Sequence, residues 1–281
     1  MNTISPIDLK KAASKLPSSP QIFSKLSQLM KDPDASLDDI TDLVNTDSSL
    51  TIQVLKLSNS PAYASGVPID TLDEAINRVG FSELFKLVGM AAASQVFANR
   101  NTTYNIDGSD LWENSLACGL AMEKLATKAN MDPQEAYTIG LLRSMGKMVI
   151  NTCVKDDPEY DKYSDRITLP LTEWEENNFG LTSATVAGFI LISWNFPEHI
   201  SNTISYQYSP EDDPRGCQKV FLLNLACSIA HVVGDGLPGE VSYWNPSSSR
   251  LKNAGVTLDD YEEVKESVSE GIKEIMSSIA V

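Results

Sequence analysis

Histidine is scarce in this sequence: its 281 residues include only His199 and His231, and 32 residues separate the two. Transition-metal hydrolase sites commonly use histidine nitrogens as ligands, and histidine is the commonest general base, so two histidines leave few candidates for either kind of site. We expect one surface histidine and one helical histidine that hydrogen-bonds locally. The alternative is a two-His site, a general base or a Ser-His-Asp arrangement, but no G-x-S-x-G nucleophile elbow accompanies these residues.

The spacing of the cysteines likewise predicts neither a metal site nor a disulfide framework. The four cysteines lie at least ten residues apart and form no C-x-x-C pair. Cys118 and Cys227 fall within apolar helical patterns, where cysteine behaves as a small hydrophobe. We therefore expect reduced, buried thiols in a cytoplasmic protein, because disulfides are rare in reducing compartments.

Long apolar runs and basic clusters are also missing. No run approaches the roughly 18 to 20 apolar residues of a membrane helix, and the N-terminus has no basic stretch followed by an apolar one. We expect no membrane span, no export signal and a cytoplasmic location. With a net charge of −16 and no Lys or Arg cluster, the chain lacks the basic footprint that nucleic-acid binding normally requires.

Acidic residues are concentrated in the second part of the chain. Residues 1–105 hold 9 Lys+Arg and 11 Asp+Glu, whereas residues 106–281 hold 13 and 27. Two explanations are open: a solvated exterior that keeps the protein soluble, or an electrostatic surface that attracts a partner.

What is present is helical periodicity, almost throughout. Apolar residues repeat with the spacing of one helix face in residues 22–30, 116–125 and 221–233. Residues 84–96 are apolar nearly all round, which predicts a helix buried between two lobes. Patterns that alternate at period two over several residues are absent. The sequence therefore predicts an all-α fold of about a dozen helices joined by short loops.

Helix starts and loops divide the chain. Thr71 to Glu74 reads as a capping box, and Asp132 before Pro133 as a capped helix start. Residues 99–108 are polar and coincide with the change in charge, so they predict a boundary between two helical lobes. Residues 234–249 form a second loop before a last helix that starts near Thr257.

One motif carries the most information. Residues 140–150 read Gly-Leu-Leu-Arg-Ser-Met-Gly-Lys-Met-Val-Ile. They resemble the Leu-Leu-His-Asp-Ile-Gly-Lys motif of HD-family metal phosphohydrolases, but Arg143 and Ser144 stand where the His-Asp metal ligands belong. The segment keeps the residues that surround the metal ligands in this motif but lacks the ligands themselves.

Further pieces extend the resemblance to HDOD domains, the HD-related output domains of bacterial signalling proteins. Over roughly residues 10 to 235 the matching segments, in order, are residues 16–20, 31–37, 55–63, 69–76, 111–115, 140–150 and 180–184. The resemblance implies a multi-helical HD-like bundle. We expect an N-terminal lobe at residues 1–105, packed on a degenerate HD-like lobe at 106–235, and a loop plus C-terminal helix at 236–281.

The resemblance also locates the former metal ligands. The positions that carry ligands in HD phosphohydrolases are occupied here by Asn114, Arg143, Ser144, Ser183, Gln207, Tyr208 and Cys227. Most of these side chains are poor ligands for the metals concerned. Cys227 could bind a soft metal but has no Cys or His companion from the motif. We therefore expect no metal, no cofactor and no catalytic residues.

Arg143 has two interpretations. A guanidinium can replace the positive charge of a metal ion by pairing with a carboxylate across the former site. Alternatively, Arg143 forms an anion or nucleotide-phosphate site with Asn114, Gln207 and Tyr208, assisted by Lys147 one turn further along the same predicted helix face.

The resemblance implies a non-catalytic bacterial signalling module that acts through a protein partner. We expect its binding surface on the near-neutral N-terminal lobe or in the groove between the lobes, since an uncharged surface is desolvated more cheaply. Two alternatives remain: a metal-dependent phosphohydrolase of the HD superfamily, and a small-molecule or nucleotide sensor that uses the converted pocket.

Overall fold

The computed structural model describes residues 3–63, 67–164, 166–234 and 236–279. The helices are α1 (Pro6–Ala13), α2 (Ser19–Leu29), α3 (Leu37–Asn45), α4 (Ser48–Ser58), α5 (Leu72–Val96), α6 (Gly108–Lys128), α7 (Pro133–Leu142), α8 (Met145–Val154), α9 (Leu171–Phe179), α10 (Ser183–Ser193), α11 (Glu198–Ser205), η1 (Pro210–Asp212), α12 (Gln218–Val233), η2 (Val241–Tyr243), α13 (Ser248–Ala254) and α14 (Leu258–Ile279). No strand occurs in these ranges, only an isolated β-bridge between Asn101 and Ile106. The predicted all-α fold is confirmed.

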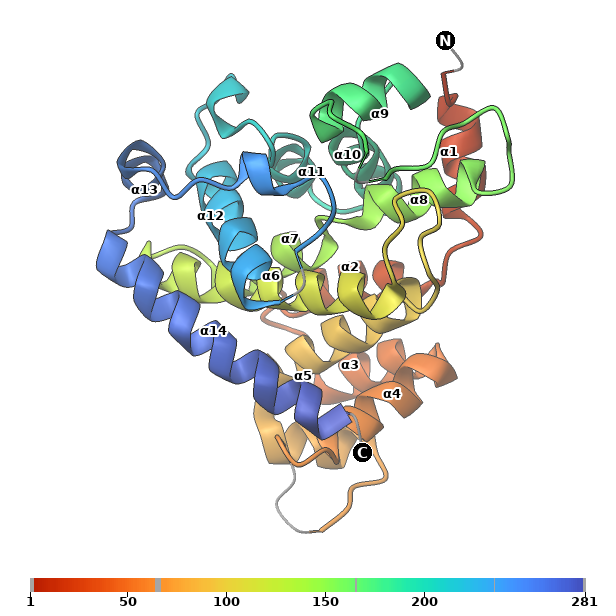
Figure 1. Ribbon diagram of the computed structural model, residues 1–281. Coiled ribbons are helices and arrows are strands. Elements are labelled where there is room, and N and C mark those ends of the chain that lie inside the picture. The colour runs from red at the N-terminus through yellow and green to blue at the C-terminus, as the bar shows by residue number, and fades with distance from the viewer. Residues whose placement is uncertain (1–2, 64–66, 165, 235, 280–281) are drawn as a thin grey trace.

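The helices form a lower group, α2 to α5, and an upper group built around α6 to α12 (Figure 1). The long helix α14 packs against α6 and α12 and runs from α13 toward the lower group. Helix α1 lies apart from the rest of the N-terminal segment, packed against α8 and α10. Within the described residues, no helix is both long and apolar enough to cross a membrane.

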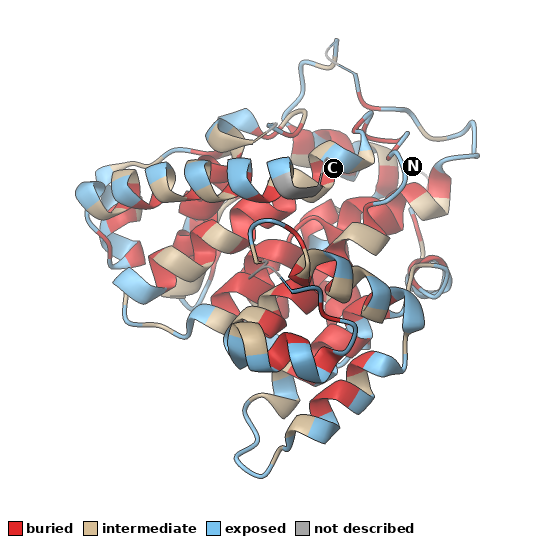
Figure 2. Cartoon of the chain, turned by 90° about the horizontal axis from the view of Figure 1, so that it is seen from below, coloured by how far each residue is buried: buried red, intermediate tan, exposed pale blue. Residues whose placement is uncertain are grey.

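Helix α5 connects the two groups. Its residues from Leu84 to Val96 are buried almost without interruption, as their all-round apolar pattern predicts. The helix is kinked at Gly80, where φ is +80° and only glycine fits without strain. Figure 2 shows the buried residues gathered in the middle of the molecule and the exposed ones on outer helix faces.

The local capping predictions are confirmed. The Thr71 hydroxyl accepts the Glu74 N–H, and the Glu74 carboxylate accepts the Thr71 N–H at 3.3 Å. Asp132 caps α7, with Pro133 at its first position. The last helix begins at Leu258, directly after Thr257, but α13 within the preceding segment was not predicted. Asp235, in the predicted loop 234–249, lies outside the described residues.

The predicted boundary loop is partly buried, with buried and exposed residues interspersed, which its polar composition did not indicate. Asn101, Thr103 and Tyr104 are at most 1% exposed. Asn101 Nδ2 donates to the Lys147 carbonyl at 3.0 Å, and Thr103 Oγ1 donates to Asn151 Oδ1 at 2.9 Å. The loop is therefore fastened to α8. The division of the chain near residue 105 stays a prediction.

Candidate functional site

The central motif lies across a break between α7 and α8. Helix α7 ends at Leu142 and α8 begins at Met145, with Ser144 at φ −93° and ψ 3° between them. The expectation that Arg143 and Lys147 share one helix face is wrong, because the helix is interrupted between them. The two cationic side chains nevertheless converge on the same carboxylate from the two sides of the break.

Both glycines of the motif permit close helix packing. A Cβ atom at Gly146 would collide with the backbone carbonyl of Ser183 at the start of α10, and one at Gly140 would lie 2.5 Å from the carbonyl oxygen of Cys118 on α6. These contacts hold α8 against α10 and α7 against α6. They therefore place the Lys147 ammonium within 3.4 Å of the Ser183 hydroxyl.

We expect Gly146→Ala to lower the free energy of unfolding by about 3 kcal/mol, because overpacking a rigid backbone contact forces α8 and α10 apart. Urea denaturation measures the loss. The matched control is Gly271→Ala on α14, where nothing lies within 4 Å of the added Cβ. That change should raise stability by up to about 1 kcal/mol through helix propensity. Equal effects of the two substitutions would contradict the close-packing role of Gly146.

Arg143 is fully enclosed. Its guanidinium donates Nη1–H to Gln207 Oε1 at 3.2 Å and Nη2–H to Glu240 Oε2 at 3.0 Å, and Nη2 also donates to Asn114 Oδ1. The Trp244 ring lies 5.5 Å from the guanidinium carbon, a cation–π distance. The side chain is 1% exposed, so no bulk solvent reaches it.

Lys147 occupies the other half of the site. Its ammonium donates to Glu240 Oε1 at 2.8 Å and to the Tyr208 hydroxyl at 2.7 Å. The rings of Tyr104 and Tyr208 lie within 5.4 Å of the ammonium. A buried ammonium with such partners is a fixed component of the core, since its charge is balanced inside the protein.

Glu240 completes a buried triad, which we define as Arg143, Lys147 and Glu240. Its side chain is 0% exposed and also accepts a hydrogen bond from the Tyr208 hydroxyl at 2.8 Å. Burial alone would raise the pKa of Glu240, but the charges of Arg143 and Lys147 outweigh it and lower that pKa to about 2. The carboxylate is therefore ionised at neutral pH.

A second buried carboxylate adjoins the triad. Glu175 Oε1 accepts the Tyr104 hydroxyl at 2.8 Å, and Glu175 Oε2 accepts the Ser183 N–H at 2.9 Å. Burial raises the pKa of Glu175, although the Lys147 charge opposes the shift. Neither Glu175 nor Glu240 was recognised in the sequence, where neither belongs to a motif.

Most residues that the resemblance assigned to ligand positions lie together. Asn114 and Gln207 bind Arg143, while Ser183 and Tyr208 bind Lys147. Ser144 is buried, and its hydroxyl has no hydrogen-bond partner within the described ranges. Cys227 has the companion that the motif did not supply, since its Sγ lies 3.7 Å from Cys118 Sγ, and both thiols are free and buried.

The remaining titratable groups give no metal-ligand set. The described residues contain no group of three or more His, Cys, Asp or Glu side chains able to hold a metal ion. His199 pairs with Glu135 at 2.9 Å, and His231 lies at the C-terminal end of α12. The four predicted anion contacts surround an anion that the chain itself supplies: Arg143 and Lys147 touch Glu240, while Asn114 and Gln207 hold Arg143. Binding of an external anion by these four stays a prediction.

Comparison with known proteins identifies a matching family model and a similar protein. The HDOD domain model matches residues 16–210. An uncharacterized protein of Treponema pallidum is 27% identical over 248 residues, which are 82% of this chain and 45% of that protein, so the chain spans about half the length of that relative. Glu240 lies beyond the matched HDOD range.

Two solved structures share the fold. A candidate phosphohydrolase of Shewanella amazonensis is 23% identical with a TM-score of 0.68, covering 96% of this chain and 97% of its own. A candidate signal transduction protein of Marinobacter aquaeolei is 20% identical with a TM-score of 0.69, covering 93% of this chain and 58% of its own. At these identities the likeness shows the helical architecture alone.

Proposed function

The chain belongs to the HDOD family, which is related to the HD phosphohydrolases, and from this premise we propose that it is a non-catalytic module of bacterial signal transduction that acts by binding a protein partner. One observation carries the proposal. A buried ion triad, Arg143–Lys147–Glu240, lies where the resemblance places the metal ligands.

The positive charges of the triad disfavour the binding of a metal ion at this site. A divalent cation beside Arg143 and Lys147 would meet two fixed positive charges in a site closed to water, where repulsion is strong. The carboxylate that would attract a metal ion is already held by both cations and by Tyr208. These contacts support the proposal that the site now stabilises the fold.

The relatives support a modular role. The Treponema pallidum protein and the Marinobacter aquaeolei protein are both longer than the segment shared with this chain. The second is named as a candidate signal transduction protein. A unit that recurs within longer proteins and retains a rigid core is suited to pass a signal by contact with another protein.

We expect the purified protein to contain no stoichiometric Fe, Mn, Zn or Ni and to hydrolyse neither bis(p-nitrophenyl) phosphate nor p-nitrophenyl phosphate. The reason is that none of the seven former ligand positions keeps the family ligand. Elemental analysis and both assays, run with each metal added, measure this. About one metal per chain, lost in Glu240→Ala and Cys227→Ala variants and accompanied by hydrolysis, would defeat the proposal.

The partner surface is proposed on the near-neutral N-terminal lobe. Ile52 on α4 is 61% exposed and Phe81 on α5 is 45% exposed, whereas most large apolar side chains are buried. Large apolar groups left in water on a weakly charged face are the cheapest to cover with another protein. The acidic remainder of the chain would steer a basic partner and accelerate association at low salt.

We expect Ile52→Glu and Phe81→Glu to reduce capture of a partner from native cell lysate at least about 10-fold, since a buried charge opposes interface formation. The matched control is Ile192→Glu on α10, which is 52% exposed and should leave capture unchanged. If capture survives both N-terminal changes but is lost in an Arg143→Ala variant that circular dichroism shows to be folded, a sensor function of the converted site should replace this proposal.

A further inference from the structure

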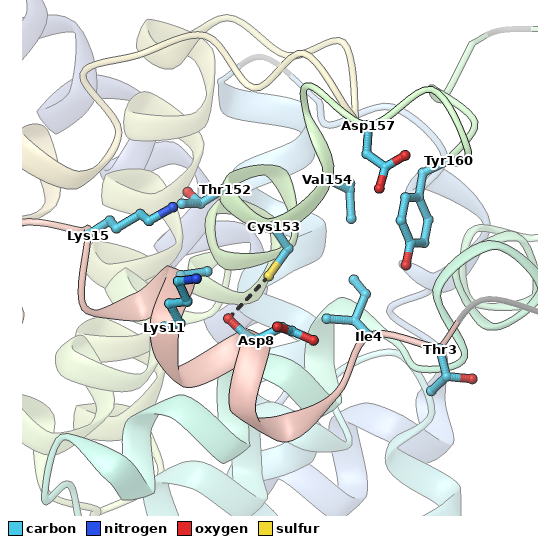
Figure 3. Close-up of a pocket in the computed structure, with 11 residues that line it drawn as sticks. Thr3, Ile4, Asp8, Lys11, Lys15, Thr152, Cys153, Val154, Asp157 and Tyr160 are labelled. Carbon is cyan, nitrogen blue, oxygen red and sulfur yellow. Dashed lines mark hydrogen bonds between the residues drawn. The ribbon is translucent and has the colours of Figure 1, made fainter.

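Two buried thiols meet beside the triad. Cys118 on α6 and Cys227 on α12 are both 0% exposed, and their Sγ atoms lie 3.7 Å apart. The other two cysteines, Cys153 and Cys217, are partly exposed. Cys153 donates to the Asp8 carbonyl at 3.7 Å in the pocket between α1 and α8 (Figure 3). The buried pair therefore supplies two sulfur atoms at one point in the core, away from the surface cysteines.

The thiol pair adjoins the helices that hold Arg143. Cys118 follows Asn114 by one turn of α6, and Asn114 Oδ1 accepts a hydrogen bond from Arg143 Nη2. A Cβ atom at Gly140, one turn before Arg143, would lie 2.5 Å from the Cys118 carbonyl oxygen. Burial raises the pKa of Cys227 well above its ordinary value, whereas the Arg143 charge opposes that shift. The guanidinium is therefore close enough to stabilise negative charge on the Cys227 sulfur.

The enclosed charges of this region do not balance. The triad contributes two positive charges and one negative charge, all on side chains that are at most 1% exposed. Burial raises the pKa of the neighbouring Glu175, which disfavours its negative form. The buried Arg143 Nε–H also lacks a hydrogen-bond acceptor among the residues that the structure describes, and such donors are rarely left unpaired. A further negative group beside Arg143 would improve both the charge balance and the hydrogen bonding.

A soft monovalent cation converts the thiol pair into such a group. Thiolates favour Cu(I), which needs only two ligands, whereas a structural zinc site uses four. Across the described ranges, no group of three or more His, Cys, Asp or Glu side chains is placed to hold a metal ion, so a four-ligand site is not available there. Metal–thiolate bonds are about 2.3 Å long, so two sulfurs bound to one ion lie at most about 4.6 Å apart. The separation of 3.7 Å between the two Sγ atoms is within that limit.

We propose that Cys118 and Cys227 bind one Cu(I) ion. Each thiol releases its proton to solvent, two S–Cu bonds form, and no electron is transferred. Two thiolates and one Cu(I) ion carry a net charge of one negative unit, which Arg143 neutralises. A hard divalent cation would instead add positive charge beside Arg143 and Lys147. The same two cations that disfavour the metals of HD phosphohydrolases therefore favour this complex, and the proposal does not depend on the protein partner.

Anaerobic titration of the full chain with Cu(I), in competition with the chromophoric chelator bicinchoninate, tests the proposal. We expect one Cu(I) per chain and the release of about two protons per ion. Both sulfurs are closed to solvent, so the ion enters only when α6 and α12 separate locally. A parallel sample is therefore refolded with Cu(I) present. If the refolded protein does not retain Cu(I) against bicinchoninate, the proposal is wrong.

Cysteine variants assign the site. Cys118→Ala and Cys227→Ala should each weaken Cu(I) binding at least about 100-fold, because loss of a ligand costs more than the roughly 10- to 100-fold loss seen for outer-shell partners. The matched control is the double variant Cys153→Ala with Cys217→Ala, which keeps the buried pair and should bind Cu(I) as the wild type does. Circular dichroism confirms that each variant folds. Wild-type affinity in Cys118→Ala would place the ion at the surface cysteines and refute the site.

X-ray absorption at the copper edge gives a second measurement that does not require the single variants to fold. It is made on the double variant, in which Cys118 and Cys227 are the remaining cysteines. We expect two sulfur ligands per copper ion. Copper bound by nitrogen or oxygen ligands in that variant would overturn the proposal.

Discussion

Replacing Glu240 with alanine should lower the free energy of unfolding by about 3–5 kcal/mol, the range observed when one partner of a buried ion pair is removed. The substitution leaves the Arg143 guanidinium and the Lys147 ammonium in a site that is at most 1% exposed, without the carboxylate that balances them. Tyr208 loses an acceptor in the same step. Urea denaturation of wild type and variant, followed by circular dichroism, gives the difference.

The matched control is Glu211→Ala. Both carboxylate oxygens of Glu211 accept hydrogen bonds from Arg250, but the Glu211 side chain is 55% exposed. The surface pair should contribute only about 0–1 kcal/mol, because water screens it and compensates its loss. If Glu240→Ala lowers the free energy of unfolding no more than Glu211→Ala does, the triad does not stabilise the core. The C-terminal segment that contains Glu240 would then only cover the core.

The Glu240 contribution has a defined pH window. Its pKa in the folded protein is about 2, below the ordinary value of 4.5. The stabilisation is therefore complete above the unfolded value and is lost as the pH falls from 4.5 toward 2. Glu135 has a pKa lowered to about 2 by Lys219 and His199 against the opposing effect of burial, and it titrates in the same window. The difference between wild type and Glu240→Gln isolates the Glu240 part.

The resemblance located several residues of the site but not the carboxylate that balances its cations. Asn114, Arg143, Gln207 and Tyr208 were identified by likeness to the ligand positions of HD phosphohydrolases, and the structure brings them together around the triad. Glu240 could not, since it lies 97 residues after Arg143, beyond the residues that match the HDOD model. Pairing of Arg143 with a carboxylate was one of two interpretations, but 27 acidic residues after residue 105 could have supplied it.

Helices were predictable from their apolar residues, and the polar interior was not. The burial of α5 from Leu84 to Val96 follows directly from its all-round apolar pattern. Tyr104 lies in a loop whose composition resembles an exposed linker, yet its hydroxyl donates to the buried Glu175 carboxylate. Which polar groups pair in the interior depends on how several helices pack together. The amino-acid composition does not reveal this packing. The same limit applies to the break at Ser144, which interrupts a continuous apolar pattern.

Glu240 and Lys147 should be energetically coupled by about 2–3 kcal/mol, the upper part of the range for residues in direct contact. Lys147→Met removes one of the two cations, so Glu240→Ala in that background leaves only Arg143 uncompensated. The double variant should therefore be more stable than the sum of the two single losses predicts. Four urea denaturation curves, for wild type, both single variants and the double variant, give the coupling energy.

The surface pair Arg250–Glu211 provides the reference cycle, with Arg250→Met and Glu211→Ala in place of the two triad changes. Its coupling should stay within about 0.2–1 kcal/mol, because Glu211 remains largely in water. A similar small coupling in the triad would mean that Lys147 is balanced by the adjacent Glu175 and not by Glu240. Strong coupling would instead make the segment after residue 235 an integral part of this fold, since that segment supplies the carboxylate that balances Lys147.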